Sequence, residues 1–487
     1  MMELLDLTIK ELHRELVNKT ITPLDLVEEA LKRARQDNNN AFEVIMEKEA
    51  LEAASRLTKP EANNPLWGIP FAIKDNFSVK DVPATASSNI LSGYVPIFNA
   101  TVVDKLLAKH AILIGKTTLD ELAMGGSGTT GHLGKTYNPY DPSHRRMIGG
   151  SSCGSAAVVS GSITPFALGS DTGDSVRKPA SYSGLVGFKA TWGRISRYGL
   201  FPFAPSLDHV GYFTRSVYDA ASLLNVLAGR DEKDSTSSFE KVIDFTSLLN
   251  EGIKGKKIGI IKEIVDSIND KVIFERFQQL IVALRNRGAL VQYVSFPKRL
   301  LETIYPTYIV ISCAEATSNN ANLDGIKFGP FYNGKTYQEV MMNARSRGFS
   351  ELIKRRFVIG SFALMRENQD VLFLRAQKNR RLIVNTLNKI MEQFDVLLLP
   401  GAPTPAPLFE GSSDRLSDEY LIADNHLVLG NFAGLPSLTI PIGLEDSLPF
   451  SANVMGKKFR EAEVFQIGQT IEDITGLYNL SAKAVLK

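Results

Sequence analysis

The chain of 487 residues contains only two cysteines, Cys153 and Cys313. Two isolated cysteines cannot form a disulfide framework, and they lack the spacing of a metal site. This usage favours a reducing compartment. The chain has six histidines, but no HExxH, paired CxxC or phosphate-binding loop motif. We therefore expect no catalytic metal and no bound nucleotide in this chain.

The chain also lacks a charge excess and a long apolar run. Its 55 basic and 53 acidic residues leave a net charge of +2, which gives no general attraction to nucleic acid or to anionic membranes. No run approaches the ~20 apolar residues of a membrane span. The N-terminal sequence MMELLDLTIKELHREL has no apolar core of the kind found in a secretory signal. These absences predict a cytoplasmic protein that does not contact a membrane.

What is present is the composition of a large globular protein, with 44% hydrophobic and 22% charged residues. Helical and strand-like periodicities alternate along the chain, which predicts an α/β class. We expect residues 1–60 to form a helical segment packed on the core, and residues 61–487 to form one catalytic domain. The polar stretch 229–238 is a candidate surface loop or boundary, so one large sheet and two domains both remain open. Predicted helices cover 101–109 and 271–287, and predicted strands lie at 66–77, 111–115, 257–262, 289–296, 396–399 and 438–442.

The most informative segment is 149–179, GGSSCGSAAVVSGSITPFALGSDTGDSVRKP. It places Ser151 and Ser175 in glycine-rich turns at its two ends. Glycine permits positive φ and close approach, so a serine held in such a turn can act as an acyl-transfer nucleophile beside an oxyanion hole. The alternatives are a flexible linker or a chemically silent glycine crossing. The apolar runs at 156–159 and 165–168 argue against the linker and predict a helix and then a buried strand.

Lys74 ends an apolar strand in the sequence IPFAIKDNF. A lone lysine at such a position usually extends to solvent. Held in a cleft instead, it could lose its proton, because burial lowers the lysine pKa from its reference value of about 10.4. A neutral lysine could then activate a serine, which is a weak nucleophile without a base.

Three segments carry a specific resemblance: GIPFAIKDN at 68–76, GGSSCGS at 149–155 and GSDTGDSVRKP at 169–179. They resemble the amidase signature family, and further matches cover most of the chain, among them LDELAM at 119–124, GRISRYGL at 193–200 and NFAGLP at 431–436. The resemblance implies an α/β/α sandwich in which helices cover a large mixed β-sheet. It also implies a Ser-Ser-Lys triad: Ser175 as the acylated nucleophile, Ser151 as the bridging serine in a cis-peptide turn and Lys74 as the base. The oxyanion hole would use the backbone N–H groups of Thr172, Gly173, Asp174 and Ser175.

Within that family the chain is similar to the glutaminase subunits of tRNA-dependent amidotransferases, on the segments AEATSNNANLDGIKFG at 314–329 and KRRFVIGSFAL at 354–364. The resemblance implies that glutamine is the substrate. One arginine of the pair Arg355 and Arg356 would bind its α-carboxylate, and Asp424 would bind its α-ammonium. Tyr308 and Met124 match positions near the substrate pocket. The residues alone do not decide between the two arginines.

The implied activity is glutamine hydrolysis, with the ammonia used to convert Glu-tRNA(Gln), Asp-tRNA(Asn) or both into the amidated products. The implied partners are a larger tRNA-binding subunit, which would use ATP and Mg²⁺, and a small subunit, in a heterotrimer. We expect no cofactor in this chain. Two alternatives remain: a stand-alone amidase acting on small amides with the same triad, and a catalytically silent scaffold.

The chain departs from the usual family pattern at Asp174 and Cys153, where glycines are usual, at Lys178, where glutamine is usual, and at Ala190, where proline is usual. Asp174 matters most, because a carboxylate beside a forming oxyanion is repulsive unless it is paired or points away. Arg177 and Lys178 are close enough in sequence to pair with it. We predict that Asp174→Gly leaves folding intact and changes kcat by less than about 100-fold.

Overall fold

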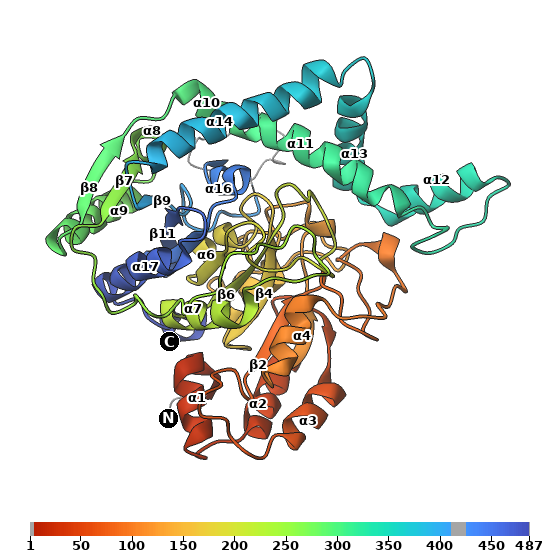
Figure 1. Ribbon diagram of the computed structural model, residues 1–487. Helices are drawn as coiled ribbons and strands as arrows, with labels where there is room; N and C mark the ends of the chain where they lie inside the picture. Colours follow the sequence, from red (N-terminus) through yellow and green to blue (C-terminus); the bar gives the residue numbers. More distant parts are fainter. Residues whose placement is uncertain (1–3, 411–424, 487) are drawn as a thin grey trace.

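The computed structural model describes residues 4–410 and 425–486. One eleven-stranded sheet crosses this part of the molecule, in the order β1-β3-β2-β4-β6-β5-β10-β11-β9-β7-β8 (Figure 1). This confirms the predicted α/β class with a large mixed sheet. It also answers the question left open by the sequence, because the strands on both sides of residues 229–238 belong to the same sheet. The strands are β1 Phe42–Ile45, β2 Pro70–Lys74, β3 Ile112–Thr117, β4 Phe166–Asp171, β5 Val186–Lys189, β6 His209–Thr214, β7 Lys257–Ile261, β8 Leu290–Val294, β9 Val396–Pro400, β10 Ser437–Glu445 and β11 Leu448–Gly456.

The sheet is mixed. Strand β2 pairs in parallel with β3 and β4, and β7 pairs in parallel with β8 and β9. The pairs in the middle of the sheet are antiparallel: β4 with β6, β5 with β6, β5 with β10, β10 with β11 and β11 with β9. Because β2 and β4 run side by side, their carboxyl ends meet, and this brings Lys74 next to Asp171 and the turn that follows it.

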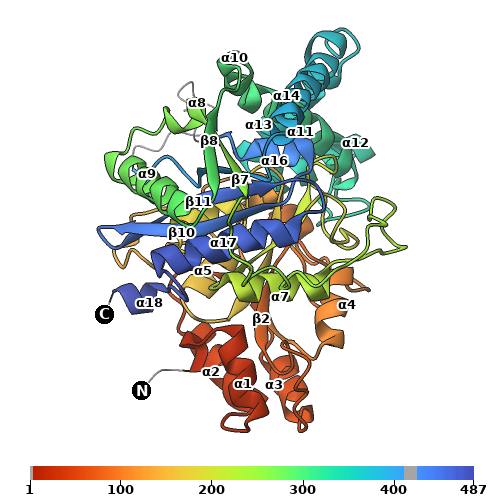
Figure 2. The ribbon, with the colours of Figure 1, turned by 60° about the vertical axis from the view of Figure 1, so that its left-hand side comes forward.

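Helices cover the sheet. In Figure 2, α17 runs along β10 with α7 beneath it, and α17 packs against both β10 and α7. The helix α5 packs on β2 and β4, and α11 packs against α13 and α14. The α-helices are α1 Ile9–Val17, α2 Pro23–Arg35, α3 Glu47–Arg56, α4 Thr101–Ala108, α5 Cys153–Ser160, α6 Arg177–Tyr182, α7 Val217–Leu227, α8 Lys262–Val265, α9 Lys271–Asn286, α10 Lys298–Glu302, α11 Ile304–Asn319, α12 Tyr337–Gly348, α13 Glu351–Leu364, α14 Arg375–Met391, α16 Val428–Ala433, α17 Glu461–Thr475 and α18 Ala482–Val485. Short turns of other helix types are η1 Leu4–Asp6, η2 Asn89–Leu91, η3 Glu121–Ala123, η4 Asn320–Asn322 and η5 Asp370–Leu374.

The first 60 residues are not purely helical as predicted. Helices α1 and α2 begin at capping boxes on Thr8 and Thr22, in which the hydroxyl and the N3 carboxylate satisfy backbone N–H groups reciprocally. Between α2 and α3, however, the chain forms β1, which pairs antiparallel with β3 and makes one edge of the sheet. Four residues of intermediate burial give little periodic signal, so tertiary pairing decides this strand.

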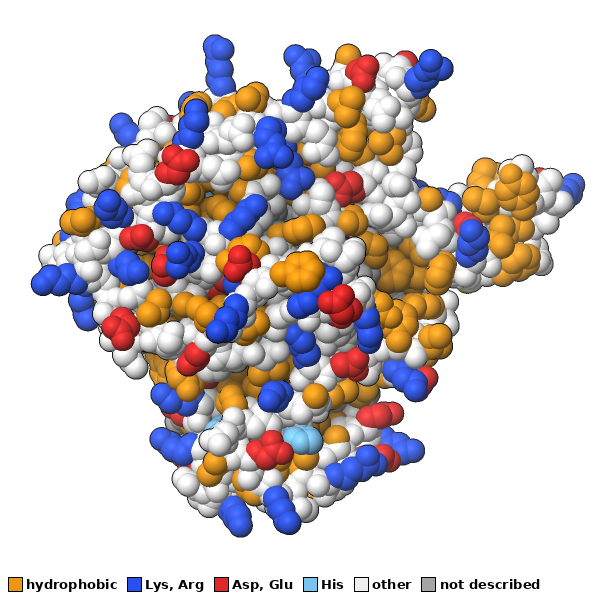
Figure 3. Space-filling model, in the orientation of Figure 1, with side chains coloured by type: hydrophobic (Ala, Val, Ile, Leu, Met, Phe, Trp, Pro, Cys, Tyr) orange, Lys and Arg blue, Asp and Glu red, His pale blue; other side chains and the backbone are white. Residues whose placement is uncertain are grey.

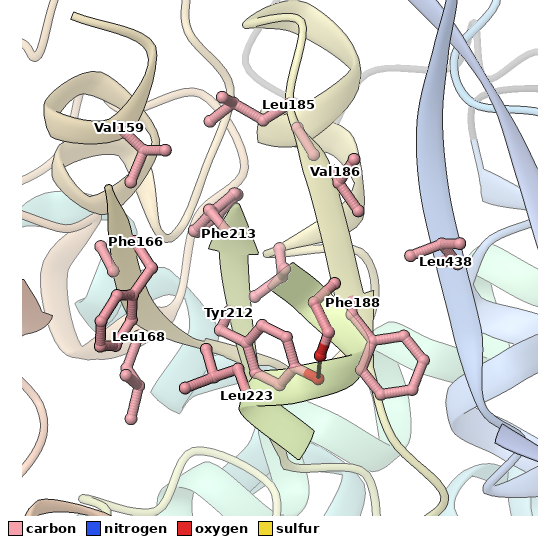
Figure 4. Packing of buried hydrophobic residues seen from close by; sticks show 14 of the residues in the cluster. Val159, Phe166, Leu168, Leu185, Val186, Phe188, Tyr212, Phe213, Leu223 and Leu438 are labelled. Carbon is pink, nitrogen blue, oxygen red and sulfur yellow. Dashed lines mark hydrogen bonds between the residues drawn. The ribbon is translucent and has the colours of Figure 1, made fainter. Parts of the chain in front are cut away.

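The centre of the sheet is held by close packing of aromatic and aliphatic side chains (Figure 4). The rings of Phe188 on β5 and Tyr212 on β6 lie 5.5 Å apart between centroids, and the Tyr212 hydroxyl donates to the carbonyl of Ala220 on α7 at 2.7 Å. Replacing a buried aromatic residue by alanine costs ~3–5 kcal/mol. We therefore expect the strands under the predicted site to form a rigid support.

Two features stand apart from the sheet. The helix α12 projects from the body (Figure 1), and apolar side chains gather on its surface (Figure 3), among them Tyr337 and Met342. The polar stretch 229–238 has no regular element and lies between α7 and β7. Among residues 4–410 and 425–486, no helix is long and apolar enough to cross a membrane.

Candidate active site

Lys74 is the last residue of β2, and its side chain is completely buried. Its Nζ donates to the hydroxyl oxygens of Ser151 at 2.8 Å, Ser152 at 3.0 Å and Ser170 at 3.0 Å. Burial lowers the pKa of Lys74 to about 7, although nearby carboxylates such as Asp120 oppose the shift. A large fraction of this lysine is therefore neutral near pH 7, with its nitrogen beside the Ser151 hydroxyl.

The turn that carries Ser151 has a cis peptide bond between Gly150 and Ser151. It packs closely on Asp120, because a Cβ at position 150 would lie 2.0 Å from Asp120 Oδ2. The Asp120 N–H donates to the Ser151 carbonyl at 3.2 Å. Its carboxylate accepts hydrogen bonds from the backbone N–H groups of residues 127–130, at 3.0–3.2 Å. Only glycine fits position 150, and Asp120 ties the serine turn to the neighbouring glycine-rich loop.

Ser175 lies between β4 and α6, and 4% of its surface is exposed. Its carbonyl accepts a hydrogen bond from the Ser152 N–H at 3.1 Å, which joins the two serine turns. The Ser175 hydroxyl makes no hydrogen bond to any described residue. The backbone N–H groups of Thr172, Gly173 and Ser175 likewise have no acceptor within the described ranges. A hydroxyl and several N–H groups in one turn are thus left without a protein partner.

A buried ion pair anchors this turn. Asp171 accepts from Arg177 Nε at 3.1 Å and Nη2 at 2.9 Å, and from Asn431 Nδ2 at 2.9 Å. Burial alone would raise the pKa of Asp171, but the Arg177 guanidinium outweighs it and the pKa of Asp171 is lowered. Arg177 also donates to the Gly173 carbonyl at 2.7 Å. The backbone on both sides of residues 172–175 is fixed by this pair.

The Asp174 carboxylate is paired with Lys178, one turn further on, at 3.1 Å. The predicted pairing with Lys178 is therefore confirmed, whereas the pairing with Arg177 is wrong, because Arg177 faces Asp171. Lys178 is buried and the Asp174 side chain is 16% exposed. Two departures from the family pattern thus neutralise each other.

The two candidate arginines on α13 differ in exposure. Arg355 is exposed, whereas Arg356 is buried. The Nε and Nη1 atoms of Arg356 have no hydrogen-bond partner among the described residues, and its guanidinium lies 5.8 Å from the ring centroid of Phe203. A buried unpaired donor costs ~1–3 kcal/mol, and more when charged. Of the two arginines, Arg356 is therefore the one whose environment calls for an anion.

The other predicted substrate residues lie as follows. The ring of Tyr308 on α11 covers Gly173, since a Cβ at position 173 would lie 3.1 Å from Tyr308 Cζ. Burial raises the pKa of Tyr308, so its hydroxyl stays protonated. Met124 is fully buried in the apolar cluster against which Tyr308 packs. Asp424 lies outside the described residues.

Histidine is not part of this arrangement. The Nδ1 atom of His209 lies 2.6 Å from the Leu207 carbonyl, and burial lowers the pKa of His209 well below its usual value. His132 lies 3.0 Å from Glu43. The sequence reasoning missed Asn431 and Ser170 as contacts of the site, although both lie within the quoted motifs NFAGLP and GSDTGDS. Residues within such a motif can be searched for buried polar partners, but only the fold shows which ones meet. Within residues 4–410 and 425–486, no group of three or more His, Cys, Asp or Glu is placed to hold a metal ion.

Comparison with a family model matches residues 25–465 of this chain to the model described as Amidase. Comparison with characterised sequences finds a subunit of the glutamyl-tRNA(Gln) amidotransferase of Pediococcus pentosaceus, 42% identical over 485 residues and covering 98% of each chain. The matches span the whole predicted catalytic region and the N-terminal segment.

Solved structures agree. The crystal structure of the corresponding subunit of the glutamyl-tRNA(Gln) amidotransferase from Thermotoga maritima matches with a TM-score of 0.79 and 36% identity, covering 97% of this chain and 96% of that one. A bacterial aryl acylamidase of the amidase signature enzymes matches with a TM-score of 0.83 and 25% identity, covering 97% and 96%. The backbone resembles both branches to a similar degree, and the higher sequence identity favours the first.

Proposed function

The chain belongs to the amidase family, and from that premise we propose that it hydrolyses glutamine and supplies the ammonia for a tRNA-dependent amidotransferase. The observation that carries this proposal is the buried Lys74, whose Nζ lies 2.8 Å from Ser151 Oγ, in a turn joined to that of Ser175. The relatives named as subunits of glutamyl-tRNA(Gln) amidotransferase support the choice of substrate system.

In the proposed mechanism, Ser175 Oγ attacks the side-chain amide carbon of glutamine. Its proton passes through Ser151 to neutral Lys74, which a pKa of about 7 allows. The N–H groups of residues 172–175 stabilise the oxyanion, at ~2.7–4 kcal/mol per donor. The proton returns through Ser151 to the leaving nitrogen, the C–N bond breaks and ammonia departs. Water then cleaves the ester on Ser175, giving glutamate and the free enzyme.

For substrate recognition, the proposal assigns the α-carboxylate of glutamine to Arg356. A guanidinium fork matches a carboxylate through two parallel hydrogen bonds, and the Nε and Nη1 atoms of Arg356 are buried without partners among the described residues. Tyr308 and Met124 would line the pocket above Gly173, and Asp424 would bind the ammonium. A stand-alone amidase for small amides has no use for a buried arginine of this kind.

In the proposed assembly, a larger subunit binds tRNA and uses ATP and Mg²⁺, and a small subunit completes a heterotrimer in the cytoplasm. The net charge of +2 is consistent with tRNA contact made mainly by the partner. Ammonia released at Ser175 would pass to the partner that activates the aminoacyl-tRNA.

The test is ammonia release from L-glutamine by the chain together with its co-purifying subunits. The comparison is a Ser175→Ala protein purified in the same way. Activity that is present in the first and absent in the second supports the proposal. Equal activity in both would contradict it, and hydrolysis of simple amides with no preference for L-glutamine would favour the stand-alone amidase.

A further inference from the structure

A second polar pocket lies between α14, α16 and the turn that joins β11 to α17. Its volume is about 370 Å³, within the range of small-molecule sites. Three cationic side chains line it: Arg380 and Arg381 of α14, and Lys458 of the turn. No Asp or Glu is among the described residues that line it. Figure 3 shows Lys and Arg side chains over the part of this face where Figure 1 places α14.

The three cations differ in what they already contact. Arg380 donates to the carbonyl oxygens of Phe432 and Ser206, at 3.1 Å and 3.0 Å, so it builds the wall of the pocket. Arg381 and Lys458 are exposed and make no ion pair or hydrogen bond with any described residue. Like charges gathered without a counter-charge repel one another, and two unpaired cations match a ligand with two negative charges.

The remaining walls are apolar or aromatic. Trp192, Phe432 and Val384 line the pocket beside the cations. Gly434 ends α16 with φ +66°, and a Cβ there would lie 3.1 Å from Trp192 Cβ and 3.9 Å from Lys458 Cε. The glycine therefore lets the indole and the lysine approach the end of α16. A pocket with cations on one side and rings on the other suits an anion that carries an apolar group.

We propose that this pocket binds a small phosphate monoester, with the phosphate between Arg381 and Lys458 and its organic part against Trp192, Phe432 and Val384. A phosphate monoester is close to doubly charged near pH 7 and offers several acceptor oxygens, which matches the two unpaired cations better than a single carboxylate. The pocket lies away from Lys74 and Ser151 but also reaches Asn431, the partner of Asp171. The binding proposal stands whether or not the chain hydrolyses glutamine.

The experiment is isothermal titration of the full-length chain with phenyl phosphate and with inorganic phosphate, at matched ionic strength. We expect saturable binding at one site per chain, with phenyl phosphate at least about tenfold tighter because it also buries a ring. Arg381→Gln and Lys458→Gln should each weaken phenyl phosphate binding about tenfold or more. Arg375→Gln, on the exposed surface of the same helix, and Lys389→Gln are the matched controls and should leave it unchanged.

Three results would overturn the proposal. The first is no saturable binding of either probe. The second is binding that the two pocket variants leave intact, which would place the anion elsewhere. The third is binding that all four variants weaken alike, which would mean general charge attraction. Equal affinity for the two probes would overturn the assignment of the organic part to the apolar wall.

Discussion

Lys74 and Arg356 are both buried cations of the candidate site, but their surroundings differ. Lys74 has three hydroxyl acceptors supplied by the chain, whereas two nitrogens of Arg356 have no described partner. Since the fold supplies the contacts of Lys74, the base is positioned before any substrate arrives. Arg356 and the N–H groups at Thr172, Gly173 and Ser175, which lack an acceptor among the described residues, are instead left for a ligand to satisfy. The comparison separates a part of the site that is complete from a part that glutamine would complete.

The largest expected effect tests the complete part. Ser175→Ala removes the proposed nucleophile and should lower kcat for L-glutamine by about 10⁴-fold or more. Ser160→Ala is the matched control, since that buried serine hydrogen-bonds only within its own helix. Steady-state ammonia release measures both. Substantial activity in the Ser175 variant would assign the chemistry to another group.

The next effect tests the part that waits for substrate. Arg356→Gln should raise KM for L-glutamine by about 100-fold, because it removes a charge-assisted pair to the α-carboxylate. The neighbouring Arg355→Gln makes the same change on the exposed face of the helix and should leave KM within about twofold. If the two variants gave the same KM, the assignment to Arg356 would be wrong.

A third prediction concerns the charge of Lys74. Its pKa of about 7 lies below the usual lysine value, so the base is neutral above pH 7 and protonated below it. We expect kcat/KM to rise with pH, about tenfold per unit below pH 7, and to level off above it. A pH series of initial rates from about pH 5.5 to about pH 8.5 measures this. A flat profile between pH 6 and 7 would contradict the role of Lys74 as the base.

The smallest effect concerns the pair that replaces the usual glycine and glutamine. Asp174→Gly alone leaves buried Lys178 without its carboxylate, and Lys178→Gln alone leaves Asp174 uncompensated beside the oxyanion site. We expect each single change to lower kcat several-fold, within the limit of about 100-fold, and the double variant to be more active than either. Additive losses in a double-mutant cycle would show that the pair is not coupled.

The sequence predicted the part of the site that depends on local pattern. The strand ending at Lys74, the serine turns and the helix and strand between them all lie where periodicity and glycine placed them. It could not choose between Arg355 and Arg356, because adjacent helical residues differ only in the face they occupy, and packing of α13 on α11 decides which face is buried. It also missed β1, whose pairing with β3 comes from the sheet edge rather than from its own residues.

The most direct test of the central claim is whether glutamine hydrolysis passes through an ester on Ser175. Hydroxylamine should divert that ester to γ-glutamyl hydroxamate in place of glutamate. We expect L-glutamine and γ-glutamyl p-nitroanilide to give the same ratio of hydroxamate to glutamate, because both would form one common intermediate. Ratios that differ between the two donors, or ammonia release with no hydroxamate, would contradict the acyl-enzyme account.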